Sequence, residues 1–78
     1  MKTDKKVILI EDEEKLLDLL LFNLREDFNI EGYKDAESFL ADFSPENVSV
    51  IITDVRLPGM DGIELLKKIK QGFSHIPI

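Results

Sequence analysis

Three acidic residues stand where two apolar segments of this chain end. Glu11 and Asp12 follow the apolar run Val7–Ile10, and Asp54 follows the run Val48–Thr53. If these runs are neighbouring parallel strands, their carboxyl ends meet at one edge of a sheet, which is where such sheets bind ligands. Mg²⁺ accepts one or two carboxylates together with water and phosphate oxygens. The pattern therefore predicts a site for a divalent cation.

The same arrangement predicts phosphoryl chemistry. A carboxylate such as that of Asp54 can act as a nucleophile and form an aspartyl phosphate. A cation shared with Asp12 would offset charge on the phosphoryl oxygens, which is most of what phosphoryl transfer requires. Taken singly, each feature also has an ordinary explanation. The run Glu11–Glu14 is typical of a solvated helix N-terminus, and Asp54 alone is typical of a helix cap or turn.

Hydrophobic periodicity predicts the elements that position these acids. Strands are predicted over residues 5–10, 30–34 and 48–53, with a fourth beginning at 76–78. A first helix is predicted over residues 13–27. Asp35 is predicted to cap a second helix that ends at Pro45, and Asp61 a third that ends at Gly72. This alternation predicts an α/β fold, with right-handed crossovers and helices on both faces of a parallel sheet.

Each long helix has an apolar face that predicts what it buries. In the first helix this face consists of Leu16, Leu17, Leu20, Leu21, Leu24 and Phe28. In the third helix it consists of Ile63, Leu66, Ile69 and Phe73. Leu19 and Phe22 lie off the main face of the first helix, so we expect both side chains to be exposed unless another segment covers them.

Composition narrows the class of protein. The chain has 78 residues, 44% of them hydrophobic, which predicts one globular domain at most. A formal net charge of −6 argues against nucleic-acid binding by this segment, because duplex recognition depends on Lys and Arg. There is no cysteine, and no apolar run approaches the ~20 residues that span a bilayer. The basic start, Met1–Lys6, precedes an apolar run that breaks on acids after four residues, which favours the cytoplasm over secretion.

Taken together, these segments resemble the receiver domain of bacterial two-component response regulators. Val7–Glu13 resembles the first strand and acidic pair of that family, and Ile51–Gly62 resembles its phosphoacceptor strand and following loop. His75–Ile78 resembles the beginning of its fourth strand. The resemblance covers the whole chain. It implies that residues 1–78 are part of a flavodoxin-like doubly wound parallel sheet that runs as far as the beginning of strand four.

The resemblance also implies a role for each site residue. Asp54 would be the phosphoacceptor and, with Asp12, a direct ligand of Mg²⁺. Glu11 would assist through water, and Arg56 would contribute its backbone carbonyl to the metal. Pro58 and Gly59 would shape the loop. The phosphoryl group would come from a sensor histidine kinase, a phosphotransfer protein or a small phosphodonor.

The resemblance leads us to expect more than these residues supply. The family carries a hydroxyl residue at the end of strand four and a lysine at the end of strand five, and both would fall after residue 78. We therefore expect a partial receiver domain, impaired in phosphorylation by itself. We also expect it to self-associate through the strand-four edge or the first helix. A DNA-binding output domain is possible in the parent protein.

Four other functions were weighed against this one. The first is a phosphate-independent, receiver-like module for interaction or dimerisation. The second is a phosphatase with an aspartyl nucleophile, which is disfavoured because that class has a second acid two residues on, where this chain has Arg56. A P-loop is excluded by the lack of a Gly-rich loop ending in Gly-Lys-Ser/Thr, and an EF-hand by the absence of its oxygen ligands. We expect a signalling module and not a turnover enzyme.

Overall fold

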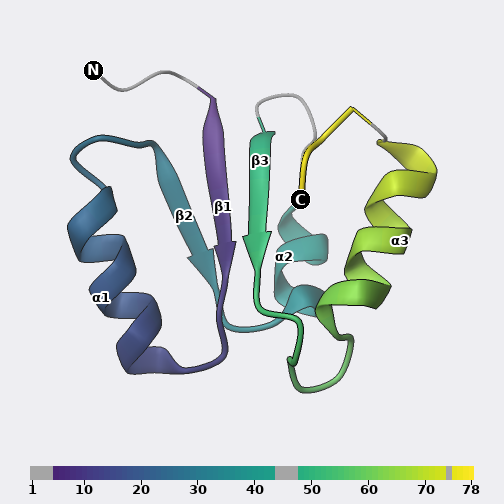
Figure 1. Ribbon diagram of the computed structural model, residues 1–78, viewed down its shortest axis with the longest axis horizontal. Helices are drawn as coiled ribbons and strands as arrows, with labels where there is room; N and C mark the ends of the chain where they lie inside the picture. Colours follow the sequence, from purple (N-terminus) through teal and green to yellow (C-terminus); the bar gives the residue numbers. More distant parts are fainter. Residues whose placement is uncertain (1–4, 44–47, 74) are drawn as a thin grey trace.

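A three-stranded parallel sheet forms the centre of the molecule. The computed structural model describes residues 5–43, 48–73 and 75–78. The strands lie in the order β2-β1-β3, and their bounds are Lys6–Ile10 for β1, Ile30–Tyr33 for β2 and Val48–Thr53 for β3 (Figure 1). The helices are α1 (Glu14–Leu24), α2 (Ala36–Asp42) and α3 (Gly62–Gly72). The predicted βαβ alternation is confirmed, and β2 lies at an edge of the sheet.

The strand register brings the ends of β1 and β3 level with each other. Ile10 pairs with Thr53 across these strands, and with Tyr33 on the other side. The residues that follow each strand therefore emerge at the same edge. Both strand pairings are parallel, as expected for strands that alternate with helices along the chain.

Two layers of helix cover the sheet. On one side, Leu17 and Leu21 of α1 lie beside Gly32 of β2. On the other, β1 and β3 share a buried cluster with α2 and α3, which consists of Ile8, Ile10, Ala36, Phe39, Ile51, Leu57, Leu65, Ile69 and Ile76. Successive residues of a strand point to opposite faces, which is why Ile8 and Ile10 belong to this cluster and Leu9 does not.

A row of aromatic rings ties α2 to its neighbours. The ring centroids of Tyr33 and Phe39 are 5.4 Å apart, those of Phe39 and Phe43 are 5.1 Å apart, and those of Phe43 and Phe73 are 5.2 Å apart. The edge-to-face geometry of the first and last pairs is the favourable one for aromatic side chains. The row holds the start of α2 against the sheet and its end against the end of α3.

Both predicted helix caps are present. The Ser38 N–H donates to Asp35 Oδ1 at 2.6 Å at the start of α2. The Glu64 N–H donates to Asp61 Oδ1 at 2.8 Å at the start of α3. Each bond satisfies a backbone donor that the helix itself leaves free. The predicted end of α2 at Pro45 lies outside the described residues.

Two predicted core residues are exposed instead. Helix α1 ends at Leu24, three residues earlier than predicted, so Phe28 no longer follows the helical period and is 48% exposed. In α3 the buried positions are Gly62, Leu65 and Ile69, and Ile63 is 46% exposed because it lies one residue further round the helix. Sequence analysis missed Leu65, which is fully buried.

The residues predicted to begin strand four lie beside β3. The Ile51 N–H donates to the Pro77 carbonyl at 2.9 Å, and Ile76 is buried in the core. Lys70 Nζ also donates to the Ile76 carbonyl, at 2.6 Å, which ties this segment to α3. Within residues 75–78 the structure has no extended ladder, only this first contact. Across the described part of the chain, every helix is too short or too polar to cross a bilayer.

Candidate metal site

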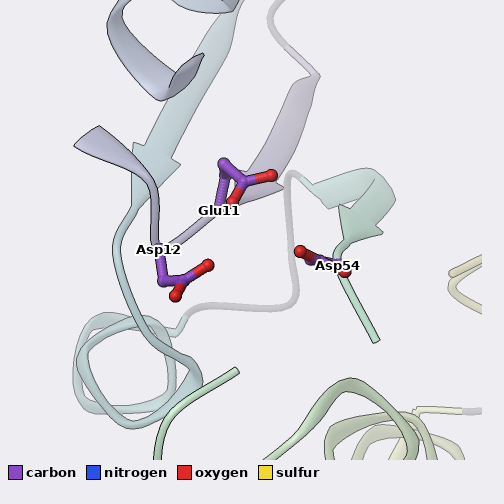
Figure 2. Close-up of side chains that lie close together, drawn as sticks. All are labelled: Glu11, Asp12 and Asp54. Carbon is purple, nitrogen blue, oxygen red and sulfur yellow. The ribbon is translucent and has the colours of Figure 1, made fainter. Parts of the chain in front are cut away.

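Glu11, Asp12 and Asp54 come together at the carboxyl end of the sheet. One carboxylate oxygen from each residue lies within 4.8 Å of the others. Figure 2 shows the three side chains gathered about one space, with Glu11 and Asp12 following β1 and Asp54 following β3. Since Ile10 and Thr53 are paired, the strand register alone places these acids at one edge. The predicted meeting of the two acidic segments is confirmed.

Main-chain bonds hold both acidic segments in place. The Asp54 N–H donates to the Ile10 carbonyl at 3.1 Å, and the Glu11 N–H donates to the Tyr33 carbonyl at 3.0 Å. The sheet ladder therefore continues one residue past the strand ends. Glu11 is half-buried, and its Oε2 accepts from the Glu13 N–H at 3.1 Å, which orders the turn into α1.

The carboxylate of Asp54 lies beside its own loop. The Arg56 N–H points at Asp54 Oδ1, at 3.4 Å, and the Thr53 hydroxyl donates to the Asp54 carbonyl at 2.9 Å. Asp54 is itself exposed, so an incoming group can reach its side chain. The Arg56 side chain is also exposed. The role of its backbone carbonyl as a metal ligand stays a prediction.

Helix α3 begins directly against the backbone of Asp54. Gly62 is buried, and a Cβ atom at this position would lie 2.5 Å from the Asp54 carbonyl oxygen and 3.0 Å from Val55 Cα. The Gly62 N–H also donates to the Val55 carbonyl at 2.9 Å. Only glycine permits this approach. The role of Gly62 was not predicted from the sequence, because no local pattern indicates how closely α3 approaches the backbone of Asp54.

The loop between Asp54 and α3 has two more fixed points. Leu57 is only 8% exposed and anchors the loop in the core. Gly59 has a φ of 71°, a left-handed conformation that suits glycine, and the Met60 N–H donates to Glu37 Oε2 at 3.0 Å. The predicted shaping role of Gly59 fits this conformation. Sequence analysis missed Glu37, since its contact spans 23 residues.

The donor set fits Mg²⁺. All three side chains are carboxylates, which offer the hard oxygen donors that this ion prefers. Asp12 and Asp54 are exposed, so water and phosphate oxygens could complete the shell of a bound ion. Oxygens on opposite sides of a bound Mg²⁺ lie about 4.2 Å apart, because each Mg–O bond is about 2.1 Å. The observed limit of 4.8 Å therefore requires only a small movement of flexible side chains.

The response regulator receiver domain family matches residues 7–78. Among curated proteins, the chain is 36% identical over 76 residues to the alkaline phosphatase synthesis transcriptional regulatory protein PhoP of Bacillus subtilis. It is 37% identical over 79 residues to the transcriptional regulatory protein FixJ of Bradyrhizobium diazoefficiens. These alignments cover 96% and 100% of this chain, but only 32% and 38% of the relatives.

Solved structures agree with this assignment. A response regulator receiver domain protein from Clostridium thermocellum superposes with a TM-score of 0.85 and 25% identity, over 92% of this chain and 60% of that one. The response regulator TrrA of Thermotoga maritima, solved in complex with Mg²⁺-BeF, gives a TM-score of 0.81 at 26% identity, over 92% of this chain and 64% of that one. TrrA has also been solved in complex with the histidine kinase ThkA. The chain belongs to the response regulator receiver domain family of two-component systems.

Proposed function

We propose that this chain is a phosphoacceptor domain in which Asp54 receives a phosphoryl group from a sensor histidine kinase or a phosphotransfer protein. The observation that carries the proposal is the meeting of Glu11, Asp12 and Asp54 at one point of the sheet edge. An exposed carboxylate beside two further carboxylates suits a nucleophile that works next to a cation. A related protein supports the proposed kinase partner and the proposed cation, because TrrA has been solved in complex with a histidine kinase and with Mg²⁺-BeF.

The proposed step is a displacement at phosphorus. An Asp54 Oδ atom forms a bond to the phosphorus of a phosphohistidine as the P–N bond breaks. The electron pair of that bond goes to the imidazole nitrogen, which takes a proton from solvent. The main-chain bond from Asp54 to Ile10 and the contact with Gly62 hold the nucleophile in position while its partner docks.

Asp12 and Asp54 would hold Mg²⁺ directly, Glu11 through water, and Arg56 through its carbonyl. When bound, Mg²⁺ neutralises charge on the phosphoryl oxygens. Glu11 serves this arrangement by ordering the turn that carries Asp12. The product stays attached to Asp54, so we expect a signalling module and not a turnover enzyme.

The wider setting is also a proposal. PhoP and FixJ are named transcriptional regulatory proteins, and the chain spans about a third of the length of each. We expect a DNA-binding output domain in the parent protein and a cytoplasmic location, and no nucleic-acid binding by these residues. We further expect self-association, since Leu19 and Phe22 on α1 and Ile52 on β3 are 59%, 64% and 48% exposed.

Phosphorylation of the full-length parent protein with a small phosphodonor and Mg²⁺ tests the proposal, because residues 1–78 alone are expected to be impaired. Mass spectrometry should find one added phosphoryl group on Asp54, absent from Asp54→Asn and from samples with a chelator. Circular dichroism should show that the variant keeps the fold, because Asp54 is exposed. Failure of the full-length parent protein to react with a small phosphodonor and with a phosphohistidine kinase would favour the rival function, a phosphate-independent interaction module.

A further inference from the structure

The loop that follows Asp54 is held by a residue from outside the acidic cluster. Glu37 lies in the first turn of α2, 23 positions before Met60 in the chain. Its Oε2 accepts a hydrogen bond from the Met60 N–H at 3.0 Å. The same carboxylate lies directly over the Cα of Gly59, in the space that a side chain at Gly59 would occupy. Glu37 and Gly59 therefore fit together as a pair.

The start of α2 is itself well positioned for this contact. The cap of Asp35 on the Ser38 N–H fixes the first turn, and this hydrogen bond lowers the pKa of Asp35. Ala36 and Phe39, on either side of Glu37, are buried in the core. Because the backbone of this turn cannot shift freely, the Glu37 side chain projects from a fixed base.

The loop links the position of Glu37 to the surroundings of Asp54. Met60 packs against the core, and Leu57 is buried in it, so the peptides from Asp54 to Asp61 have few ways to move together. Arg56, whose N–H faces Asp54 and whose carbonyl is proposed as a metal ligand, lies in the same loop directly before Leu57. A contact that fixes Met60 and Gly59 therefore limits how far Arg56 can drift.

We propose that Glu37 is a positioning residue for the phosphoacceptor loop, acting as a hydrogen-bond acceptor for Met60 and not as a source of negative charge. It lies outside the acidic cluster of Glu11, Asp12 and Asp54. The inference rests on the proposed function for the identity of the loop, but the contact makes its own predictions for the Met60 amide and for Mg²⁺ affinity.

Three variants of the full chain test whether Glu37 acts as a hydrogen-bond acceptor or through its negative charge. Glu37→Ala removes both, whereas Glu37→Gln removes only the charge, because its amide oxygen can still accept from Met60. Glu26→Ala removes one exposed charge after α1, away from the loop, and serves as the control. NMR would follow the Met60 amide and its hydrogen exchange, and a titration would give the Mg²⁺ dissociation constant of each protein.

For Glu37→Ala we expect a shifted, faster-exchanging Met60 amide and Mg²⁺ binding weaker by roughly five-fold, about the value of one hydrogen bond. Glu37→Gln and Glu26→Ala should match the unchanged protein. The inference is overturned if Glu37→Ala leaves the Met60 amide and Mg²⁺ affinity unchanged. It is also overturned if Glu37→Gln weakens Mg²⁺ as much as Glu37→Ala, since charge would then be the cause.

A second measurement uses the fit between Glu37 and Gly59. Gly59→Ala must both adopt a positive φ and displace the Glu37 carboxylate. In the Glu37→Ala background only the backbone cost remains, so Gly59→Ala should lower stability less there than in the unchanged chain. Equal losses in both backgrounds would contradict the pairing. If the protein takes no phosphoryl group yet these effects appear, the proposed function fails while the loop contact stands.

Discussion

Asp54 owes its position to backbone contacts that a substitution can test. Its N–H is bonded to Ile10, and its carbonyl lies against the first residue of α3, Gly62. The side chain that would react is free at the surface, but the peptide that carries it is enclosed. The proposed reaction of Asp54 therefore depends on the Ile10 carbonyl and on Gly62, neither of which takes part in it.

Gly62→Ala should disturb the site without removing any functional group. The new Cβ would lie 2.5 Å from the Asp54 carbonyl oxygen, a backbone atom that can move only with its strand or helix. We expect a loss of about 1–3 kcal/mol in the free energy of unfolding, as for other overpacked sites, and slower phosphorylation of Asp54. Urea denaturation and the rate of reaction with a small phosphodonor would measure the two effects.

Gly72→Ala is the matched control, because a Cβ at that position meets nothing within 4 Å. Gly72→Ala should leave the free energy of unfolding and the phosphorylation rate near their original values. If Gly62→Ala behaves like Gly72→Ala, the close approach of α3 to Asp54 is not a constraint.

At the scale of elements, most of the arrangement could be predicted from sequence, and the misses have physical causes. Strand positions, the caps at Asp35 and Asp61, and the convergence of Asp12 with Asp54 followed from local patterns and from parallel pairing. The exposed side chains of Phe28 and Ile63 did not, because the end of a helix and its rotation on the sheet are set by tertiary packing. The contact between Glu37 and Met60 could not be predicted, since no local signal accompanies it.

Acid should weaken the start of α2 through Asp35. The hydrogen bond from Ser38 lowers the pKa of Asp35 from its usual 3.8, because it favours the ionised carboxylate. The contribution of Asp35 to stability is therefore complete above that value and is lost as pH falls through the lower, folded-state pKa. Glu31 acts in the same direction, since its hydrogen bond from Lys6 lowers its pKa from 4.5.

Urea denaturation across the acid range would check this dependence. Asp35→Ala should lower the free energy of unfolding at neutral pH, because it removes the N-cap. Asp35→Asn should keep a working cap at every pH, so its stability should fall less steeply with acid than that of the unchanged chain. If the stability of Asp35→Asn and of the unchanged chain falls identically with acid, the assignment of this pH dependence to Asp35 is contradicted.

At the scale of the whole molecule, two apolar areas can be distinguished on the surface of the described residues. One is on α1, where Leu19 and Phe22 are exposed. The other is a groove of about 310 Å³ along the outer edge of β3 and the start of α3, lined by Val50, Ile52, Val55, Ile63, Leu66 and Ile78 among others. A strand near the edge of a sheet, beside exposed apolar side chains, favours pairing with another chain.

Self-association through one of these areas should appear by light scattering at micromolar concentrations. Ile52→Lys places a charge in the β3 groove, and Phe22→Lys places one on α1. Whichever variant restores a monomer identifies the area that is used. A single monomeric species for the unchanged chain across the concentration range would contradict the expectation.

A Mg²⁺ titration followed through the backbone amides of Asp12 and Asp54 tests most directly whether the two strand ends share one ion. The amides of both residues should shift together and saturate with a single dissociation constant. Asp12→Asn should weaken that binding by roughly ten-fold or more, since it removes a direct ligand. Independent titration of the two amides, or an Asn variant that binds Mg²⁺ as tightly as the unchanged chain, would show that these carboxylates do not form one site.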